Sequence, residues 1–237
     1  MRMQSGPYLL ALETATPVGS VSVWEGRSML GYVEIRQEKA HARLLLPVID
    51  GLMGHLGLRP AQLGAVAVGK GPGSYTGLRV GVSTAKGLCL SLGIPLIGIG
   101  SLEGLAAQVQ DLARSLGAAI APVIDARRME AYSALYSAEL GELAPVDARI
   151  FDAESFSGWL AARPLILVGD AAAKLLPLAA GLPGVVVLPE VQATAAGIGK
   201  LAVLRFEAGQ FEDLERFEPY YLKEFAVRPP RDLLAGT

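Results

Sequence analysis

Residues 66–81 read Val66-Ala67-Val68-Gly69-Lys70-Gly71-Pro72-Gly73-Ser74-Tyr75-Thr76-Gly77-Leu78-Arg79-Val80-Gly81, and this stretch decides how the chain folds. The apolar run Ala65 to Val68 predicts a buried strand. Three glycines and a proline between Gly69 and Gly73 predict a tight turn, because glycine adopts backbone conformations that other residues avoid. Ser74 or Thr76 can then cap a helix. A strand, a glycine turn and a helix N-terminus can together bind an anion, since free N–H groups converge there.

The details of this turn argue against a nucleotide site. No Gly-Lys-Ser/Thr follows it, so it is not a Walker A loop. Its Gly71-x-Gly73-x-x-x-Gly77 pattern loosely matches a dinucleotide fingerprint, but the acidic residue that would bind ribose is missing after the next strand. The small residues of the helix recur every four positions, at Gly73, Gly77, Gly81 and Ala85. We expect this stripe to let another helix approach closely, from within the chain or from a partner.

The composition excludes several functional classes. The chain has 237 residues, of which 51% are hydrophobic, so it can fill one large domain or two small ones. A net charge of −2 without long basic runs predicts that any link to RNA runs through a partner. The one cysteine, Cys89, fits a reducing cytoplasm. The most apolar region, residues 175–188, is broken by prolines and glycines, so we expect neither a membrane span nor a membrane partner.

The order of predicted elements indicates a mixed α/β fold. Three strands form an antiparallel meander, and β–α units follow, so a mixed sheet with helices on its faces is expected. The second half repeats this order in a degraded form. The first half is predicted to contain strands at 8–12, 20–24, 29–35, 65–68 and 95–99, a helix at 39–56 that includes Pro47, a helix ending at Leu92, and a helix at 102–116 capped by Ser101.

Two carboxylates, Glu13 and Asp125, follow the first predicted strand of each half. In a two-lobed ATPase such carboxylates would hold Mg²⁺ and the attacking water, so both are weak candidates for cofactor binding. The alternative, which we favour, is that each accepts hydrogen bonds from backbone N–H groups of its own turn. His41 and His55 are fourteen residues apart on one predicted helix, and with a single cysteine they predict no zinc site. We expect no metal and no cofactor, although acidic residues alone could still take Mg²⁺.

Four segments of the sequence resemble the TsaB family. They are residues 10–16 (Leu-Ala-Leu-Glu-Thr-Ala-Thr), 41–47 (His-Ala-Arg-Leu-Leu-Leu-Pro), 71–81 (Gly-Pro-Gly-Ser-Tyr-Thr-Gly-Leu-Arg-Val-Gly) and 97–103 (Ile-Gly-Ile-Gly-Ser-Leu-Glu). This resemblance covers about the first 110 residues well and the rest loosely. It implies the two-lobed actin/Hsp70/sugar-kinase-like (ASKHA) fold, each lobe a mixed sheet flanked by helices. The first lobe would span residues 1–104, and a degenerate second lobe would span 105–237, with a C-terminal tail that can pack back on the first.

The resemblance also implies a function. TsaB proteins are needed, with their paralogue TsaD, for threonylcarbamoylation of tRNA adenosine 37 (t6A). The catalytic paralogue carries a metal-binding His-x-x-x-His, whereas here Leu45 stands four residues after His41. The resemblance therefore implies a cytoplasmic, non-catalytic scaffold that activates TsaD, is joined by TsaE, contacts tRNA only through the complex and forms a homodimer when alone. The alternative is an ATP- or sugar-phosphate-handling enzyme of the same fold.

The helices of the first lobe are the expected docking elements, since the family pairs them with those of TsaD in a helical bundle. We expect a bulky charge at Gly81 to abolish pairing without unfolding the chain. The residues predicted to form the partner interface are Leu45, Ile49, Leu52, Leu78, Gly81, Val82 and Ala85.

Overall fold

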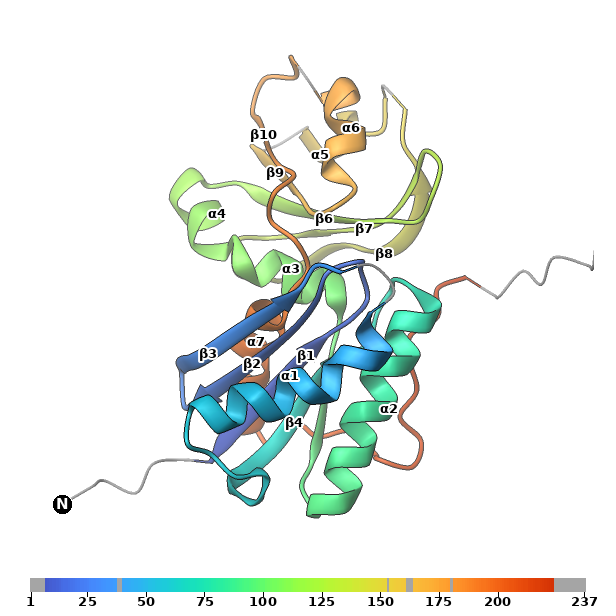
Figure 1. Cartoon of the computed structure of the whole chain (residues 1–237). Coiled ribbons are helices and arrows are strands. Elements are labelled where there is room, and N and C mark those ends of the chain that lie inside the picture. Colours follow the sequence, from blue (N-terminus) through green and yellow to red (C-terminus); the bar gives the residue numbers. More distant parts are fainter. Residues whose placement is uncertain (1–6, 38–39, 153, 161–163, 180, 224–237) are drawn as a thin grey trace, which may run out of the picture.

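The computed structural model describes residues 7–37, 40–152, 154–160, 164–179 and 181–223. They form two five-stranded sheets, one above the other in Figure 1. The first sheet has the strand order β3-β2-β1-β4-β5, in which β1 to β3 are antiparallel and β4 and β5 run parallel to β1. Its strands are β1 (Tyr8–Glu13), β2 (Gly19–Glu25), β3 (Ser28–Ile35), β4 (Leu63–Gly69) and β5 (Leu96–Ile99).

The second sheet repeats the topology of the first. Its order is β10-β9-β6-β7-β8, with β6 in the place of β1, antiparallel to β7 and parallel to β9. The doubling predicted from the sequence is therefore confirmed, and so is the ASKHA-like fold class. The strands are β6 (Ala119–Asp125), β7 (Glu130–Tyr136), β8 (Glu142–Ile150), β9 (Leu165–Val168) and β10 (Val185–Leu188).

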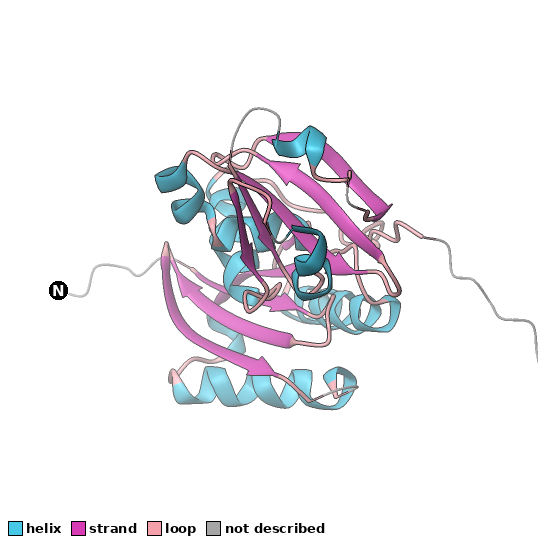
Figure 2. Cartoon of the chain, turned by 90° about the horizontal axis from the view of Figure 1, so that it is seen from above, coloured by secondary structure: helices cyan, strands magenta, loops and turns pink. Residues whose placement is uncertain are grey.

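Helices cover both faces of the first sheet, as Figures 1 and 2 show. Side chains alternate along a strand, so Leu10 and Leu12 of β1 pack towards α1 and α2, whereas Leu9 and Ala11 pack towards α7. The helices are α1 (His41–His55), α2 (Tyr75–Leu92), α3 (Ser101–Gln108), α4 (Gln110–Leu116), α5 (Ser157–Leu160), α6 (Ala172–Ala179) and α7 (Ala195–Glu207), with a 3₁₀ turn η1 at Pro60–Gln62. No helix of the described residues is both long and apolar enough to cross a bilayer.

The helix α7 follows the second sheet in the chain but packs on the first. The Ser22 hydroxyl donates to the Ala195 carbonyl at 2.8 Å, and the Ala195 N–H donates to the Ser20 hydroxyl at 2.8 Å. Gly199 lies so close to the Trp24 ring that a side chain there would overlap it. The boundary expected between residues 104 and 105 falls inside α3, and the division into lobes stays a proposal.

The prediction of one helix capped by Ser101 was wrong. Gly100 is the N-cap residue, Ser101 is the first helical residue, and the helix breaks at Val109 into α3 and α4. The helix α3 packs against α7, where Gly104 and Gly197 allow the backbones to approach. Local capping signals carry no information about this contact.

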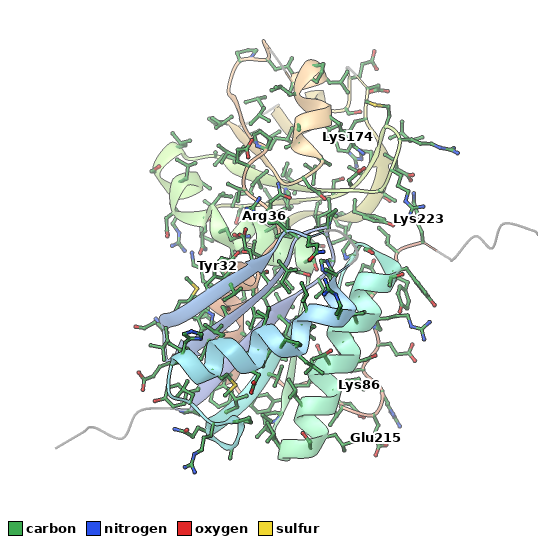
Figure 3. All side chains as sticks on the ribbon, viewed as in Figure 1. Tyr32, Arg36, Lys86, Lys174, Glu215 and Lys223 are labelled. Atoms are coloured by element: carbon green, nitrogen blue, oxygen red, sulfur yellow. The ribbon has the colours of Figure 1, made fainter. Side chains whose placement is uncertain are left out.

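The segment after α7, residues 209–223, is called the strap here because it crosses the edge strand β5 and returns along α2. Its Glu212 N–H donates to the Leu96 carbonyl at 2.9 Å, and its Tyr220 N–H donates to the Lys70 carbonyl at 2.7 Å. Lys86 of α2 donates to the carbonyls of Glu215 and Phe217, and Figure 3 shows Lys86 near Glu215. The strap ends at Lys223, which forms an ion pair with Glu130 of the second sheet.

Candidate functional site

The glycine turn brings β4 and α2 against the turn between β1 and β2, residues 13–16. The Ser74 hydroxyl accepts a hydrogen bond from the Gly77 N–H at 3.3 Å, so the cap is Ser74, one of the two residues that the sequence offered. The Thr14 hydroxyl donates to the Gly77 carbonyl at 2.8 Å, and the Ser74 N–H donates to the Ala15 carbonyl at 2.7 Å. These bonds fix α2 on the β1–β2 turn.

The small residues of α2 do not provide a groove for another helix. A Cβ at Gly73 would overlap Ala15, and a Cβ at Gly77 or Gly81 would overlap Thr14. The expected helix-packing stripe is therefore corrected: its glycines accommodate the chain's own β1–β2 turn. Gly69 has a similar role, because a side chain there would overlap the Glu13 carboxylate.

Glu13 ends β1 and is fully buried. Its Oε1 accepts hydrogen bonds from the N–H groups of Thr14 at 2.7 Å and Ala15 at 2.8 Å, which is the arrangement that we favoured from the sequence. Its Oε2, with Ser101 Oγ and His41 Nδ1, has no hydrogen-bond partner within the described part of the chain. Burial raises the pKa of Glu13, and the hydrogen bonds and His41 oppose that rise only in part.

Asp125 occupies the matching turn after β6, but its surroundings differ. It is exposed, forms an ion pair with Lys174, and accepts a hydrogen bond from the Arg127 N–H at 2.8 Å. The Asp125 N–H donates to Asp170 Oδ1 at 2.9 Å. Glu13 and Asp125 thus lie at equivalent turns, yet each is already used by local donors.

The His-x-x-x-His position of the catalytic paralogue is part of the core here. The ring Nε2 of His41 lies 3.0 Å from the Thr16 carbonyl at the start of α1, and Leu45 one turn later is buried. The described residues contain no group of three or more His, Cys, Asp or Glu side chains placed to hold a metal ion.

All seven residues predicted for the partner interface lie inside the chain's own core. Leu45, Ile49 and Leu52 of α1 pack with Val82 and Ala85 of α2 against the first sheet. Leu78 is buried as well, and Gly81 lies against Thr14. Their part in a partner interface stays a prediction, and within the chain they pack the two helices onto the first sheet.

The outward faces of α1 and α2 were not singled out from the sequence. Among their exposed residues only Arg43, Asp50 and Arg79 are formally charged at neutral pH. Two leucines are strongly exposed there, Leu46 at 56% and Leu90 at 77%. The exposed residues of this outward face are Ala42, Arg43, Leu46, Pro47, Asp50, Gly51, Gly54 and His55 on α1, and Tyr75, Thr76, Arg79, Ser83, Gly87, Leu90 and Ser91 on α2.

The chain is similar to proteins of one known family. The family described as TsaD, tRNA N6-adenosine threonylcarbamoyltransferase, matches residues 30–153, which is more than half of the chain. The chain belongs to the TsaD family. Within this family it is similar to the tRNA threonylcarbamoyladenosine biosynthesis protein TsaB of Bacillus subtilis, at 34% identity over 138 residues. That match covers 58% of the chain and 58% of the relative, so the chain spans little more than half of the curated relative's length.

Solved structures that are similar to this TsaD-family chain support the same relationship. YeaZ from Pseudomonas aeruginosa matches with a TM-score of 0.77 and 25% identity, over 91% of this chain and 100% of its own. With the curated TsaB relatives, this confirms the resemblance to TsaB. An activator of 2-hydroxyisocaproyl-CoA dehydratase from Clostridium difficile, solved with bound ADPNP, has a TM-score of 0.53 at 12% identity. It covers 86% of this chain and 97% of its own, and this likeness concerns the fold alone.

Proposed function

We propose that this chain is a partner subunit that binds and activates TsaD in the threonylcarbamoylation of tRNA adenosine 37, without catalysing the transfer itself. The proposal rests on the TsaB relatives and on the outward face of α1 and α2. It includes three further expectations: TsaE joins the pair, the chain forms a homodimer through the same face when alone, and it works in the cytoplasm.

The observation that carries the proposal is the composition of this outward face. Protein interfaces are depleted in charge at their centre, and glycines let two helices approach closely. Gly51 and Gly54 of α1 and Gly87 of α2 are exposed, with nothing within 4 Å of the position where a Cβ would stand. With the exposed Leu46 and Leu90 they offer apolar, small-residue surface to a second pair of helices.

The proposed lack of catalysis rests on how the polar groups are used. Glu13 is buried and holds its own backbone, and Asp125 is neutralised by Lys174. Leu45 stands where a second histidine would complete a metal pair. Transfer chemistry would therefore belong to the partner.

The alternative, an ATP- or sugar-phosphate-handling enzyme, is favoured by one observation: Glu13 and Asp125 end the equivalent strands β1 and β6. Calorimetric titration of the isolated chain with Mg²⁺–ATP separates the two functions. Micromolar binding, with hydrolysis lost in Glu13→Ala, would favour the enzyme and count against the partner subunit.

Pairing is tested by co-purification with TsaD. The double variant Leu46→Glu/Leu90→Glu should abolish the pair, because two carboxylates would be desolvated in the interface. The matched control is Leu112→Glu/Leu116→Glu on α4, where the leucines are 40% and 44% exposed. Both variants should fold, since each replaces exposed side chains. If the α1/α2 variant still pairs as tightly as the unmodified chain, the proposed docking face is wrong.

A further inference from the structure

Three arginines lie around the junction of the two lobes, at the α2 and strap side of the molecule. They are Arg79 on α2 and Arg127 and Arg128 in the turn between β6 and β7. All three are exposed, and none has a carboxylate within ion-pair distance in the part of the chain that the structure describes. Arg127 and Arg128 lie outside the proposed docking face on α1 and α2, and Arg79 lies at the edge of that face beside the strap, so each guanidinium is available to an anion from outside.

A series of contacts connects these arginines across the two lobes. Arg79 Cζ lies 5.6 Å from the centre of the Tyr75 ring, and that ring lies 4.8 Å from the ring of Tyr221 in the strap. Two residues later Lys223 pairs with Glu130, which begins β7 directly after the arginine turn. Figure 3 shows Lys223 at this edge, below Lys174. The arginines and the exposed ring of Tyr221 thus belong to one surface, called here the junction surface.

The β6–β7 turn holds its two arginines in an uncommon backbone conformation. Arg127 has φ 73° and Arg128 has φ 53°, in the left-handed region that costs a residue other than glycine about 1 kcal/mol or more. Lys174 stabilises the turn from beneath by donating to the carbonyls of Arg128 at 3.0 Å and Glu130 at 2.6 Å. Glycine would adopt the same turn without this cost. What arginine adds at these two positions, compared with glycine, is a pair of adjacent, exposed guanidinium groups.

The local charge balance favours a polyanion. The carboxylates of Asp125 and Glu130 are paired with Lys174 and Lys223, which leaves the three arginines unneutralised in a chain of net charge −2. Two carboxylates remain: Asp170, which accepts the hydrogen bond from the Asp125 N–H, and Glu218, an exposed carboxylate whose charge acts on Tyr221. Guanidinium groups bind phosphates in a bidentate manner, and an exposed tyrosine ring can stack on an unpaired base.

We propose that the junction surface binds the ribose–phosphate backbone of an RNA chain, with Arg79, Arg127 and Arg128 on the phosphates and Tyr221 against a base. The inference rests on the proposed function, which brings tRNA to the complex. It makes this chain a direct part of the RNA-binding surface, in addition to its contact with TsaD.

The test is an anisotropy titration of a fluorescent tRNA with the assembled pair of this chain and TsaD, at several salt concentrations. Arg79→Gln/Arg127→Gln/Arg128→Gln should weaken binding roughly tenfold, and the slope of log K against log salt should fall by about 0.7 to 0.9 per lost contact. Glu218→Gln should strengthen binding about twofold, because it removes a repulsive charge. Arg59→Gln is the matched control, since Arg59 is exposed but lies before β4, away from the junction surface.

Three outcomes would overturn the inference. One is an unchanged affinity and salt slope in the folded triple variant. Another is loss of pairing with TsaD in that variant with normal RNA binding by the pairs that remain, which would assign the arginines to a protein. The third uses the chain alone at low salt, where we expect weak RNA binding and the same order of affinities among the variants. No RNA binding by the chain alone, together with no effect of the variants in the pair, would also refute the inference. Failure of the unmodified chain to pair with TsaD contradicts the proposed function instead, and the titration of the chain alone then decides the inference.

Discussion

The carboxylate of Glu13 serves the chain's own turn. It ends the central strand β1, where the fold places a turn next to the glycine segment. Its carboxylate is turned inwards, with one oxygen on two backbone N–H groups and the other near Ser101. A protonated Oε2 could donate to the Ser101 hydroxyl, which would satisfy two buried atoms that otherwise have no partner among the described residues.

Glu13→Gln tests this reading through the pH dependence of stability. Burial raises the pKa of Glu13 in the folded state above its unfolded value of 4.5, so its stabilising contribution is present below pH 4.5 and is lost as the pH rises through the folded pKa. The amide keeps the acceptor for Thr14 and Ala15 and gains a donor towards Ser101. We expect the variant to melt at a higher temperature than the unmodified chain at pH 7.5, with a smaller difference near pH 4.5. Equal differences at both pH values would show that ionisation of Glu13 does not matter.

Gly81 and Gly87 make a matched pair on α2. A Cβ at Gly81 would overlap the Thr14 hydroxyl, whereas nothing lies within 4 Å of a Cβ at Gly87. We expect Gly81→Ala to destabilise the chain by about 1 to 3 kcal/mol through overpacking, and Gly87→Ala to stabilise it by about 0.5 to 1 kcal/mol. Urea denaturation measures both. Gly81→Arg should therefore unfold the chain, so this variant does not test pairing. This differs from our expectation from the sequence, which was loss of pairing in a folded chain.

At the scale of elements, local signals predicted α2 well. The residues at its two ends are themselves the signals: Ser74 caps its N-terminus, and Gly93, with φ 66°, ends it. The direction of its small-residue stripe was not predictable in this way, because the residue it accommodates, Thr14, lies 63 positions before Gly77. The same limit applies to the seven residues predicted for the partner interface: apolar periodicity identifies the packed face of a helix, and within the chain the first sheet lies against that face. Their contact with a partner stays a prediction.

The position of α7 was missed for a related reason. Its pattern indicates a helix, but its contacts are with Ser20 and Ser22, more than 170 residues earlier. Nothing in the local sequence signals that the chain crosses back to the first sheet. The packing partner of α3 was missed for the same reason.

The strap gives a prediction at this scale. Lys86 is the side chain that ties α2 to two strap carbonyls, those of Glu215 and Phe217. Lys86→Met keeps the aliphatic stem and removes the donor, so we expect a loss of about 1 to 2 kcal/mol. Hydrogen exchange at the Glu212 and Tyr220 amides should become faster, while exchange within α7 should not. Uniform acceleration throughout the chain would instead indicate global destabilisation without a specific role in the strap.

For the whole molecule, the crossing of α7 makes the two halves interdependent. Without α7 the apolar side of the first sheet, which includes Leu9, Ala11 and Trp24, would be exposed. We expect a fragment of residues 1–118 to remain unfolded by circular dichroism, and the same fragment joined to residues 189–223 by a flexible linker to fold. A folded 1–118 fragment would show that the first lobe is independent of α7.

The central claim is that this chain acts by activating TsaD. The most direct measurement is transfer of labelled threonylcarbamoyl groups to tRNA by purified TsaD and TsaE, with and without this chain. We predict that product forms with the unmodified chain and with Leu112→Glu/Leu116→Glu, and is lost without the chain or with Leu46→Glu/Leu90→Glu. Equal product formation in the absence of the chain would contradict the account.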